Sequence, residues 1–211
     1  MTFNICLINN YNNAIYLKEC IDSVMNQSIP FDQIIVVDDG STDDSPSILN
    51  FFKVNFKNFI FLEKENGGQV STLNFSRDFI PEDSQVFLLD ADDSYPIDYL
   101  ENVINAAQFR SWDFAFCEHH IFDGKKTLPL HASQRSNVSP IFFECTSALT
   151  RSRECWIGNL TSTLSLSGAV FRKIFPYPIK SNETLYADDL VIFATSILGY
   201  FKIYLPSIVI N

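Results

Sequence analysis

The chain is short of positive charge: its 211 residues include only 15 Lys and Arg against 25 Asp and Glu, a formal net charge of −10. Because contacts with nucleic-acid phosphates need clustered Lys and Arg, this balance argues against a nucleic-acid-binding protein. No apolar run approaches the ~20 residues of a membrane-spanning helix, since the apolar segment 190–201 is too short. The N-terminal segment has no Lys or Arg before Lys18 and is interrupted by Asn9 and Asn10, which argues against a secretory signal peptide.

Cysteines are few and irregularly placed. The chain has five of them, at positions 6, 20, 117, 145 and 155, with no CxxC spacing. Their odd number and spacing indicate neither a zinc site nor a complete disulfide framework. Buried thiols in a reducing compartment are expected instead. We therefore predict a cytoplasmic protein, and peripheral association with the inner face of a membrane stays open.

Apolar residues are abundant and follow a regular order. They make up 46% of the chain and include 20 Phe, which indicates a globular domain with a substantial core. In the first half, buried strands are predicted at 3–8, 33–37, 58–62 and 86–89, and helices at 14–26, 45–52 and 69–79. This alternation is typical of a parallel α/β sheet. In the second half, strands are predicted at 112–117, 167–172, 202–205 and 207–210, and helices near Pro96 and before Leu198.

The segment Val86–Asp93 contains the most informative pattern. Four apolar residues are followed at once by Asp90, Asp92 and Asp93, so a buried strand is predicted to present three carboxylates at its end. Carboxylates packed this closely resist joint ionisation unless a cation joins them. Oxygen ligands of this kind suit Mg2+ or Mn2+. The alternative is an acidic turn that caps the next helix.

Polar clusters follow each of the first four predicted strands. They are Asn9–Asn12, Asp38–Asp39, Asn66–Gly68 and Asp90–Asp93. Ligands of open parallel sheets gather at the carboxyl ends of the strands, where these clusters are expected to line one crevice. Gly67 and Gly68 permit a close backbone approach, and the helix start behind them offers free N–H groups to an anion.

Further polar residues occur later in the chain. Asp188 and Asp189 stand at a predicted helix start, where favourable interaction with the helix dipole accounts for one carboxylate and leaves the second free. Adjacent His119 and His120 would point to opposite faces of a strand, so a shared metal is not expected. A polar stretch from Asp123 to Asn137 is predicted to be a loop.

Six motifs together resemble the inverting glycosyltransferases of family 2, which have the GT-A fold. They are Asn9–Asn12, Ile34–Asp43, Asn66–Gly68, Leu88–Asp93, Ser167–Arg172 and Ala187–Asp189. The resemblance extends from about residue 3 to 205. It implies an α/β GT-A fold, with a Rossmann-like, mostly parallel central sheet flanked by helices and a small additional antiparallel sheet. It also implies a single domain, 1–211, with a nucleotide-sugar-binding half (1–95) and an acceptor-binding half (96–211).

The resemblance assigns donor-binding roles to five residues. Tyr11 would stack on the nucleotide base, and Asp39 would accept a hydrogen bond from a ring N–H of that base. Asn9 and Gly68 would line the nucleoside pocket, and Asp90 would approach the ribose.

The remaining acidic residues receive roles in the reaction. Asp92 would bind the Mn2+ or Mg2+ ion that bridges the donor diphosphate. Asp189 would be the catalytic base. Asp93 and Asp188 would support these groups or face the acceptor.

The implied reaction is metal-dependent transfer of a sugar, with inversion, from a nucleotide sugar to a hydroxyl of a glycan or lipid-linked acceptor, as in surface polysaccharide synthesis. A UDP-sugar is the expected donor. The chain departs from the family pattern at Asn9-Asn10, where Pro-Thr is frequent, and at Leu73, where arginine is frequent. The alternative is therefore a catalytically silent module that binds a nucleotide sugar or glycan. A nucleotidyltransferase is disfavoured because the segment 9–13 lacks the Gly-rich basic loop of that class.

Overall fold

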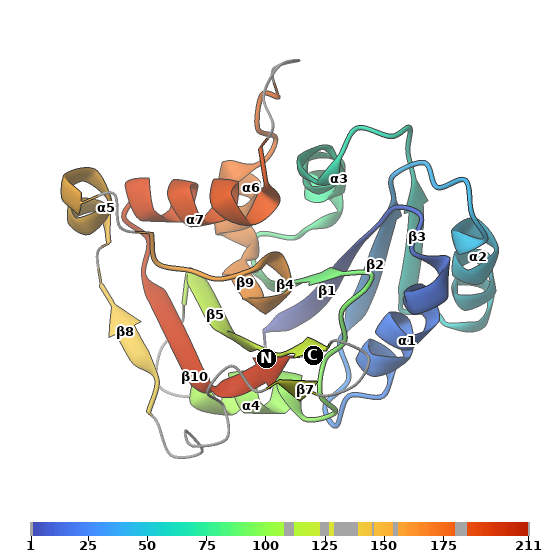
Figure 1. Cartoon of the computed structure of the whole chain (residues 1–211), viewed down its shortest axis with the longest axis horizontal. Helices are drawn as coiled ribbons and strands as arrows, with labels where there is room; N and C mark the ends of the chain where they lie inside the picture. Colours follow the sequence, from blue (N-terminus) through green and yellow to red (C-terminus); the bar gives the residue numbers. More distant parts are fainter. Residues whose placement is uncertain are drawn as a thin grey trace.

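The computed structural model describes residues 2–107, 112–122, 127–128, 139–144, 146–153, 156–179 and 185–210. Its first half alternates strands and helices as the sequence predicts (Figure 1). The elements are β1 (Phe3–Asn10), α1 (Ala14–Met25), β2 (Gln33–Asp38), α2 (Ser45–Asn55), β3 (Phe59–Glu63), α3 (Gln69–Ser76), the 3-10 turn η1 (Arg77–Phe79) and β4 (Ser84–Asp90).

The second half is less regular. Its helices are α4 (Tyr99–Ala106), α5 (Ser147–Arg153), α6 (Gly168–Ile174) and α7 (Ala187–Ile197), with a 3-10 turn, η3 (Thr161–Thr163). Its strands are β5 (Phe114–His119), β6 (Ile121–Phe122), β7 (Thr127–Leu128), β8 (Ile141–Phe143), β9 (Leu164–Ser167) and β10 (Lys202–Ile210).

An eight-stranded sheet in the order β3-β2-β1-β4-β9-β5-β10-β8 organises the molecule. Strands β3, β2, β1 and β4 are parallel neighbours, and β10 pairs in parallel with β5. The antiparallel strand β9 lies between β4 and β5, and β8 is antiparallel to β10. Strands β6 and β7 form a separate antiparallel pair. The predicted α/β fold, with a mostly parallel sheet and a small antiparallel one, is thus confirmed.

Two apolar cores cover the two faces of the sheet. Cys6 and Ile8 of β1 point into the core under α1, α2 and α4, whereas Ile5 and Leu7 point into the core under α3, α6 and α7. Helices α3, α6 and α7 lie together above the sheet in Figure 1. Burial on both faces explains why the central strands are continuous apolar runs.

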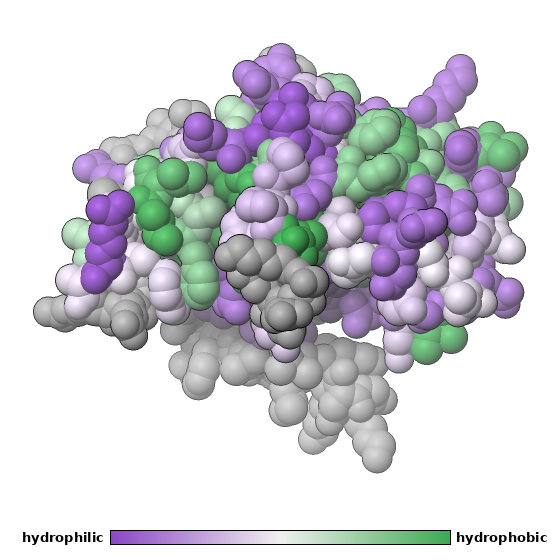
Figure 2. Space-filling view, turned by 90° about the horizontal axis from the view of Figure 1, so that it is seen from above, coloured by the Kyte–Doolittle hydropathy of each residue, from purple (hydrophilic) through white to green (hydrophobic). Residues whose placement is uncertain are grey.

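The face seen from above in Figure 2 is largely polar, with separate apolar patches. Exposed apolar side chains of α3, η1 and α7 include Phe75, Phe79 and Ile197. Within the described ranges, no helix combines the length and hydrophobicity that crossing a membrane requires.

The strand predicted at 167–172 is wrong, because the chain there forms helix α6 after the short strand β9. Ser167 ends β9, and its hydroxyl accepts a hydrogen bond from the Val170 N–H, 3.3 Å away, which caps the helix. At Gly168 a Cβ atom would lie 1.9 Å from the carbonyl oxygen of Pro81, so only glycine fits this turn. A short apolar run does not by itself distinguish a strand from a buried helix.

The two strands predicted at the end of the chain form one, β10, with a shift in register against β5 between Leu205 and Val209. Pro206 lies in the shifted stretch, where its missing N–H is tolerated. Cys6, Cys20 and Cys117 are buried free thiols, as predicted. The described residues do not include Cys145, Cys155 or most of the predicted loop at 123–137. The division of the domain near residue 95 stays a prediction.

Candidate active site

The parallel strands bring four of the polar clusters to one edge of the sheet. Asn9 of β1 is in register with Asp90 of β4, and Asn10 is in register with Asp38 of β2. The Asn9 amide donates a hydrogen bond to the Asp90 carboxylate. Asn9 and Asp90, both predicted to bind the donor, are therefore neighbours.

The loops after β1 and β2 support each other. The buried Asp38 carboxylate accepts hydrogen bonds from the Asn10 amide (2.6 Å) and from the N–H (2.9 Å) and hydroxyl (2.6 Å) of Ser41. Asn12, with a positive φ of 54°, accepts from the Thr42 N–H at 2.7 Å. Tyr11, predicted to stack on the base, is 48% exposed in the loop that these hydrogen bonds hold in place.

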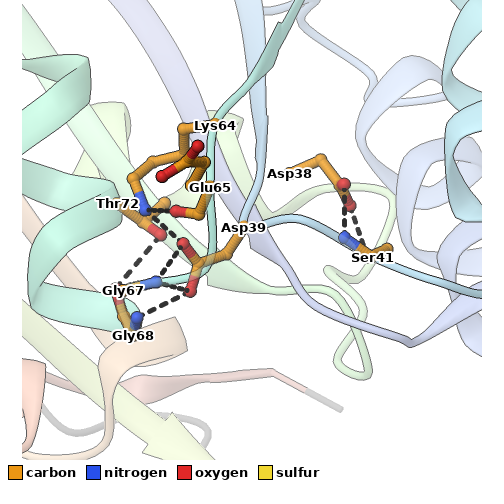
Figure 3. A network of polar contacts seen from close by, with 8 residues as sticks. All are labelled: Asp38, Asp39, Ser41, Lys64, Glu65, Gly67, Gly68 and Thr72. Carbon is orange, nitrogen blue, oxygen red and sulfur yellow. Dashed lines mark hydrogen bonds and ion pairs between the residues drawn. The ribbon is translucent and has the colours of Figure 1, made fainter.

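Asp39 lies at the centre of a second network (Figure 3). Its carboxylate accepts hydrogen bonds from the backbone N–H groups of Gly67 (3.0 Å) and Gly68 (2.7 Å), and it forms an ion pair with Lys64. Gly68, predicted to line the nucleoside pocket, has a φ of 82° and precedes α3. The network therefore joins the end of β2 to the N-terminus of α3.

Leu73 is one departure from the family pattern. Its side chain is buried in the core above the sheet. The next residue, Asn74, exchanges two hydrogen bonds with the backbone of Tyr177. This part of α3 therefore serves packing.

Asp90 is a buried carboxylate at the end of β4. It accepts hydrogen bonds from the amides of Asn9 and Gln69, the latter at 2.7 Å. Burial raises the pKa of Asp90 to about 6; the Asn9 amide opposes this rise, and nearby carboxylates, including Asp188, add to it.

The turn η3 supports the same strand end from the other side. The Ser162 hydroxyl accepts a hydrogen bond from the Asp90 N–H (2.9 Å) and donates one to the Asp93 carboxylate (2.5 Å). Burial raises the pKa of Asp93; the Ser162 hydrogen bond opposes the rise, the charge of Asp92 adds to it, and nearby His119 opposes it. Gln69 and Ser162 were not predicted to lie here, since no local pattern reports a contact with a distant strand end.

Asp92 differs from its neighbours, because its side chain is exposed and accepts no hydrogen bond from the described residues. No group of three or more His, Cys, Asp or Glu within those residues is arranged to hold a metal ion. Mg2+ is commonly bound through one or two carboxylates together with the phosphates of its substrate. An accessible Asp92 beside Asp90 fits a cation of this kind.

The two late acidic residues occupy the first turn of α7. Asp188 is half-buried, and its carboxylate accepts the Asp189 N–H at 2.9 Å. Asp189 is exposed, and no described residue donates a hydrogen bond to its carboxylate. This arrangement agrees with the expectation that one carboxylate interacts with the start of the helix and the other does not. The catalytic role of Asp189 stays a prediction.

The family model of glycosyl transferase family 2 matches residues 6–173. The chain belongs to this family. A curated relative, an uncharacterized glycosyltransferase from Nostoc sp., is 31% identical over 202 residues, which are 93% of this family 2 chain and 60% of the relative. The minor teichoic acid biosynthesis protein GgaA of Bacillus subtilis is 39% identical over 98 residues, covering 44% of this chain and 22% of that protein.

Solved structures show the same fold. The crystal structure of S. aureus TarS 1-349 superposes with a TM-score of 0.73 at 21% identity, over all of this family 2 chain and 59% of that one. The mannosyltransferase PcManGT from Pyrobaculum calidifontis, in complex with GDP-Man and Mn2+, has a TM-score of 0.69 at 21% identity, with 99% of this chain and 56% of that chain covered. The chain thus spans about 60% of the length of such relatives.

Proposed function

We propose that this chain catalyses metal-dependent transfer of a sugar from a UDP-sugar to a hydroxyl of a glycan or lipid-linked acceptor, with inversion at the anomeric carbon. The observation that carries the proposal is the sheet edge at which Asp39 follows β2 and at which Asp90 and the accessible Asp92 lie at the end of β4, since β2 and β4 are the two parallel neighbours of β1. Family 2 membership supports the reaction class. TarS has been crystallised with UDP and with UDP-GlcNAc, which supports the choice of donor.

The nucleotide would occupy the loops after β1, β2 and β3. Tyr11 offers an exposed ring on which a base can stack, and Asp39 offers a carboxylate acceptor for a ring N–H. Asn9 and Gly68 would form the walls of the nucleoside pocket. The buried Asp90 would accept a ribose hydroxyl, because its position is held by Asn9 and Gln69.

The diphosphate would lie beside Asp92. A divalent cation, Mn2+ or Mg2+, held there would stabilise the negative charge that develops on the departing diphosphate. Asp93, held by Ser162, would keep the Asp90–Asp93 turn in place. The net charge of −10 makes such a cation the natural partner of an anionic donor at this acidic edge.

The acceptor would be activated from α7. Asp189 would take the proton of the attacking hydroxyl while the hydroxyl oxygen forms a bond to the anomeric carbon and the sugar–phosphate bond breaks on the opposite side. This in-line displacement inverts the anomeric carbon and needs no covalent intermediate. Holding both substrates in one site contributes further acceleration through orientation.

Relatives suggest the kind of acceptor. GgaA is named for minor teichoic acid biosynthesis, and a second relative, from Bacillus spizizenii, is a poly(ribitol-phosphate) beta-glucosyltransferase that is 36% identical over 87 residues. We therefore propose a cell-surface polymer or its lipid-linked precursor as the acceptor class.

Turnover of UDP-sugars with Mn2+ tests the proposal. We expect Asp189→Asn to lower kcat by roughly 10²- to 10⁴-fold, because the general base is lost. Asp92→Ala should lower kcat/KM by more than about 100-fold, because the charge-stabilising cation loses its ligand. Asp83→Asn is the matched control, since Asp83 is an exposed carboxylate just before β4, at the opposite end of that strand.

Full activity in both Asp92→Ala and Asp189→Asn would refute the assigned roles. UDP binding without turnover, over a broad set of donors and acceptors, would favour the silent binding module. Absence of any nucleotide binding would refute both functions.

A further inference from the structure

Lys64 is a largely buried lysine beside the carboxylate proposed to bind the base. It is the first residue after β3, and its backbone N–H donates to the Asp38 carbonyl oxygen at 3.0 Å. Its ammonium group forms an ion pair with Asp39 and also donates to the Glu65 carbonyl oxygen (Figure 3). The side chains of Lys64 and Asp39 are only 12% and 5% exposed, so their small accessible surface is a paired donor and acceptor.

The backbone around this pair leaves little room for rearrangement. At Gly40, a Cβ atom would lie 2.9 Å from the Asn66 backbone nitrogen and 3.2 Å from the Lys64 carbonyl oxygen. The loops after β2 and β3 are therefore in direct contact, and the position of Lys64 relative to Asp39 is set by the main chain.

The Asp39 carboxylate retains some capacity for a ligand. An ionised carboxylate has about four acceptor positions. Three donors of the described residues use them: the Lys64 ammonium, the Gly68 N–H, and the Gly67 N–H, which both carboxylate oxygens share at 3.0 and 3.2 Å. About one acceptor position of the four is left. The ammonium of Lys64 has three N–H donors, two of which meet Asp39 and Glu65. A ligand that supplies one N–H and one adjacent carbonyl oxygen would match what remains.

We propose that Lys64 and Asp39 together recognise a ring N–H and the carbonyl next to it on the nucleotide base. Asp39 accepts a hydrogen bond from the N–H, and Lys64 donates one to the carbonyl oxygen. This inference rests on the proposed nucleotide-binding function and adds Lys64 as a residue that determines base specificity. Uracil and guanine both present a ring N–H next to a carbonyl. Cytosine and adenine present an unprotonated ring nitrogen beside an amino group. The ring nitrogen would then face the Asp39 carboxylate, with two acceptors opposed, and the amino group would face the Lys64 ammonium, with two donors opposed.

Nucleotide binding by calorimetry tests the pair, with UDP, GDP, CDP and ADP in the presence of Mn2+. The wild-type chain should bind UDP more tightly than CDP or ADP. Lys64→Met should weaken UDP binding about 10- to 100-fold, the usual value of a hydrogen bond to a charged group, and leave the weak binding of CDP unchanged. Lys64→Arg should retain the preference for UDP. Lys57→Met is the matched control, because Lys57 is exposed and lies before β3.

Thio-substituted UDP separates a direct contact from a purely structural role of Lys64. Replacing either ring carbonyl oxygen by sulfur gives a weak acceptor. One of the two monothio analogues should bind the wild-type chain less tightly than UDP, and this difference should disappear in Lys64→Met. If Lys64→Met weakens UDP and both analogues by the same factor, Lys64 does not contact the base and the inference is overturned.

The thermal transition of each variant shows whether it is folded. If Lys64→Met is unfolded, the comparison rests on Lys64→Arg and the wild-type chain, and equal binding of UDP and both monothio analogues by the wild-type chain overturns the inference. Failure of the wild-type chain to bind any nucleotide would instead refute the proposed function.

Discussion

Lys202 should make the stability of this protein rise with pH. Its side chain is fully buried in β10 and donates to the carbonyl oxygens of Ile157 (2.8 Å) and Ile192 (3.2 Å) and to the Ser196 hydroxyl (2.7 Å). It also lies over the ring of Phe114, 4.5 Å from the ring centroid. No carboxylate of the described residues pairs with it, so burial lowers the pKa of Lys202 from 10.5 to about 7.

The direction in which stability changes with pH follows from the number of protons bound to the folded and unfolded states. Between pH 7 and 10.5 the folded protein has released the Lys202 proton, whereas the unfolded chain still holds it. The unfolded state binds more protons in this window, so the free energy of unfolding should increase by about 1.4 kcal/mol per pH unit from this residue. Below pH 7 both states are protonated, and the contribution no longer changes.

Lys202→Met isolates this effect, because methionine is also unbranched and flexible but lacks the amine. We expect urea denaturation at pH 7, 8, 9 and 10 to show the stability difference shifting toward the wild type by about 1.4 kcal/mol per pH unit. Cysteines and tyrosines titrate in both proteins and cancel in the difference. The exposed Lys57→Met should follow the wild type. A constant difference between Lys202→Met and the wild type across this range would refute the reasoning.

Two further substitutions test the supports of the fold. Gly168→Ala should lower the free energy of unfolding by about 3 kcal/mol or more, because the alanine Cβ would lie 1.9 Å from the Pro81 carbonyl oxygen. A change in the urea midpoint too small to measure would contradict this clash. Asp43→Ala should cost about 1 kcal/mol, because the Asp43 carboxylate accepts the Ala14 N–H at the start of α1 at 2.9 Å. Burial raises the pKa of Asp43, but the hydrogen bond from the Ala14 N–H and others outweigh it, so the pKa is lowered. The stability that Asp43 contributes should therefore be lost as pH falls through this pKa. A stability difference between Asp43→Ala and the wild type that stays the same in acid would argue against this hydrogen bond.

Much of the parallel sheet could be predicted because its strands are buried on both faces. Ile5 and Leu7 enter one core and Cys6 and Ile8 the other, so the strand is a continuous apolar run in the sequence. Polar residues that end such runs must meet at one edge once the strands are parallel. The neighbouring positions of Asn9 and Asp90 follow from that rule.

The second half was harder to predict because its apolar runs are short. The segment 167–172 fits a strand or a buried helix equally well, and the cap at Ser167 and the tight contact at Gly168 select the helix. The closing segment is predicted as two strands because Pro206 interrupts it, yet β5 pairs with the chain both before and after Pro206 and makes it one strand.

The amino-acid order alone determined the alternation of strands and helices, the family motifs and the acidic residues at the ends of the strands, because local periodicity and composition report burial directly. Only the tertiary structure decided that Ser162 holds Asp93, that Lys64 pairs with Asp39 and that Lys202 lies without a carboxylate partner among the described residues. These contacts join residues 25 to 69 positions apart, or bury a charge inside an apolar core. The free energy of such contacts depends on which surfaces meet in the folded chain, and no local pattern of residues encodes that.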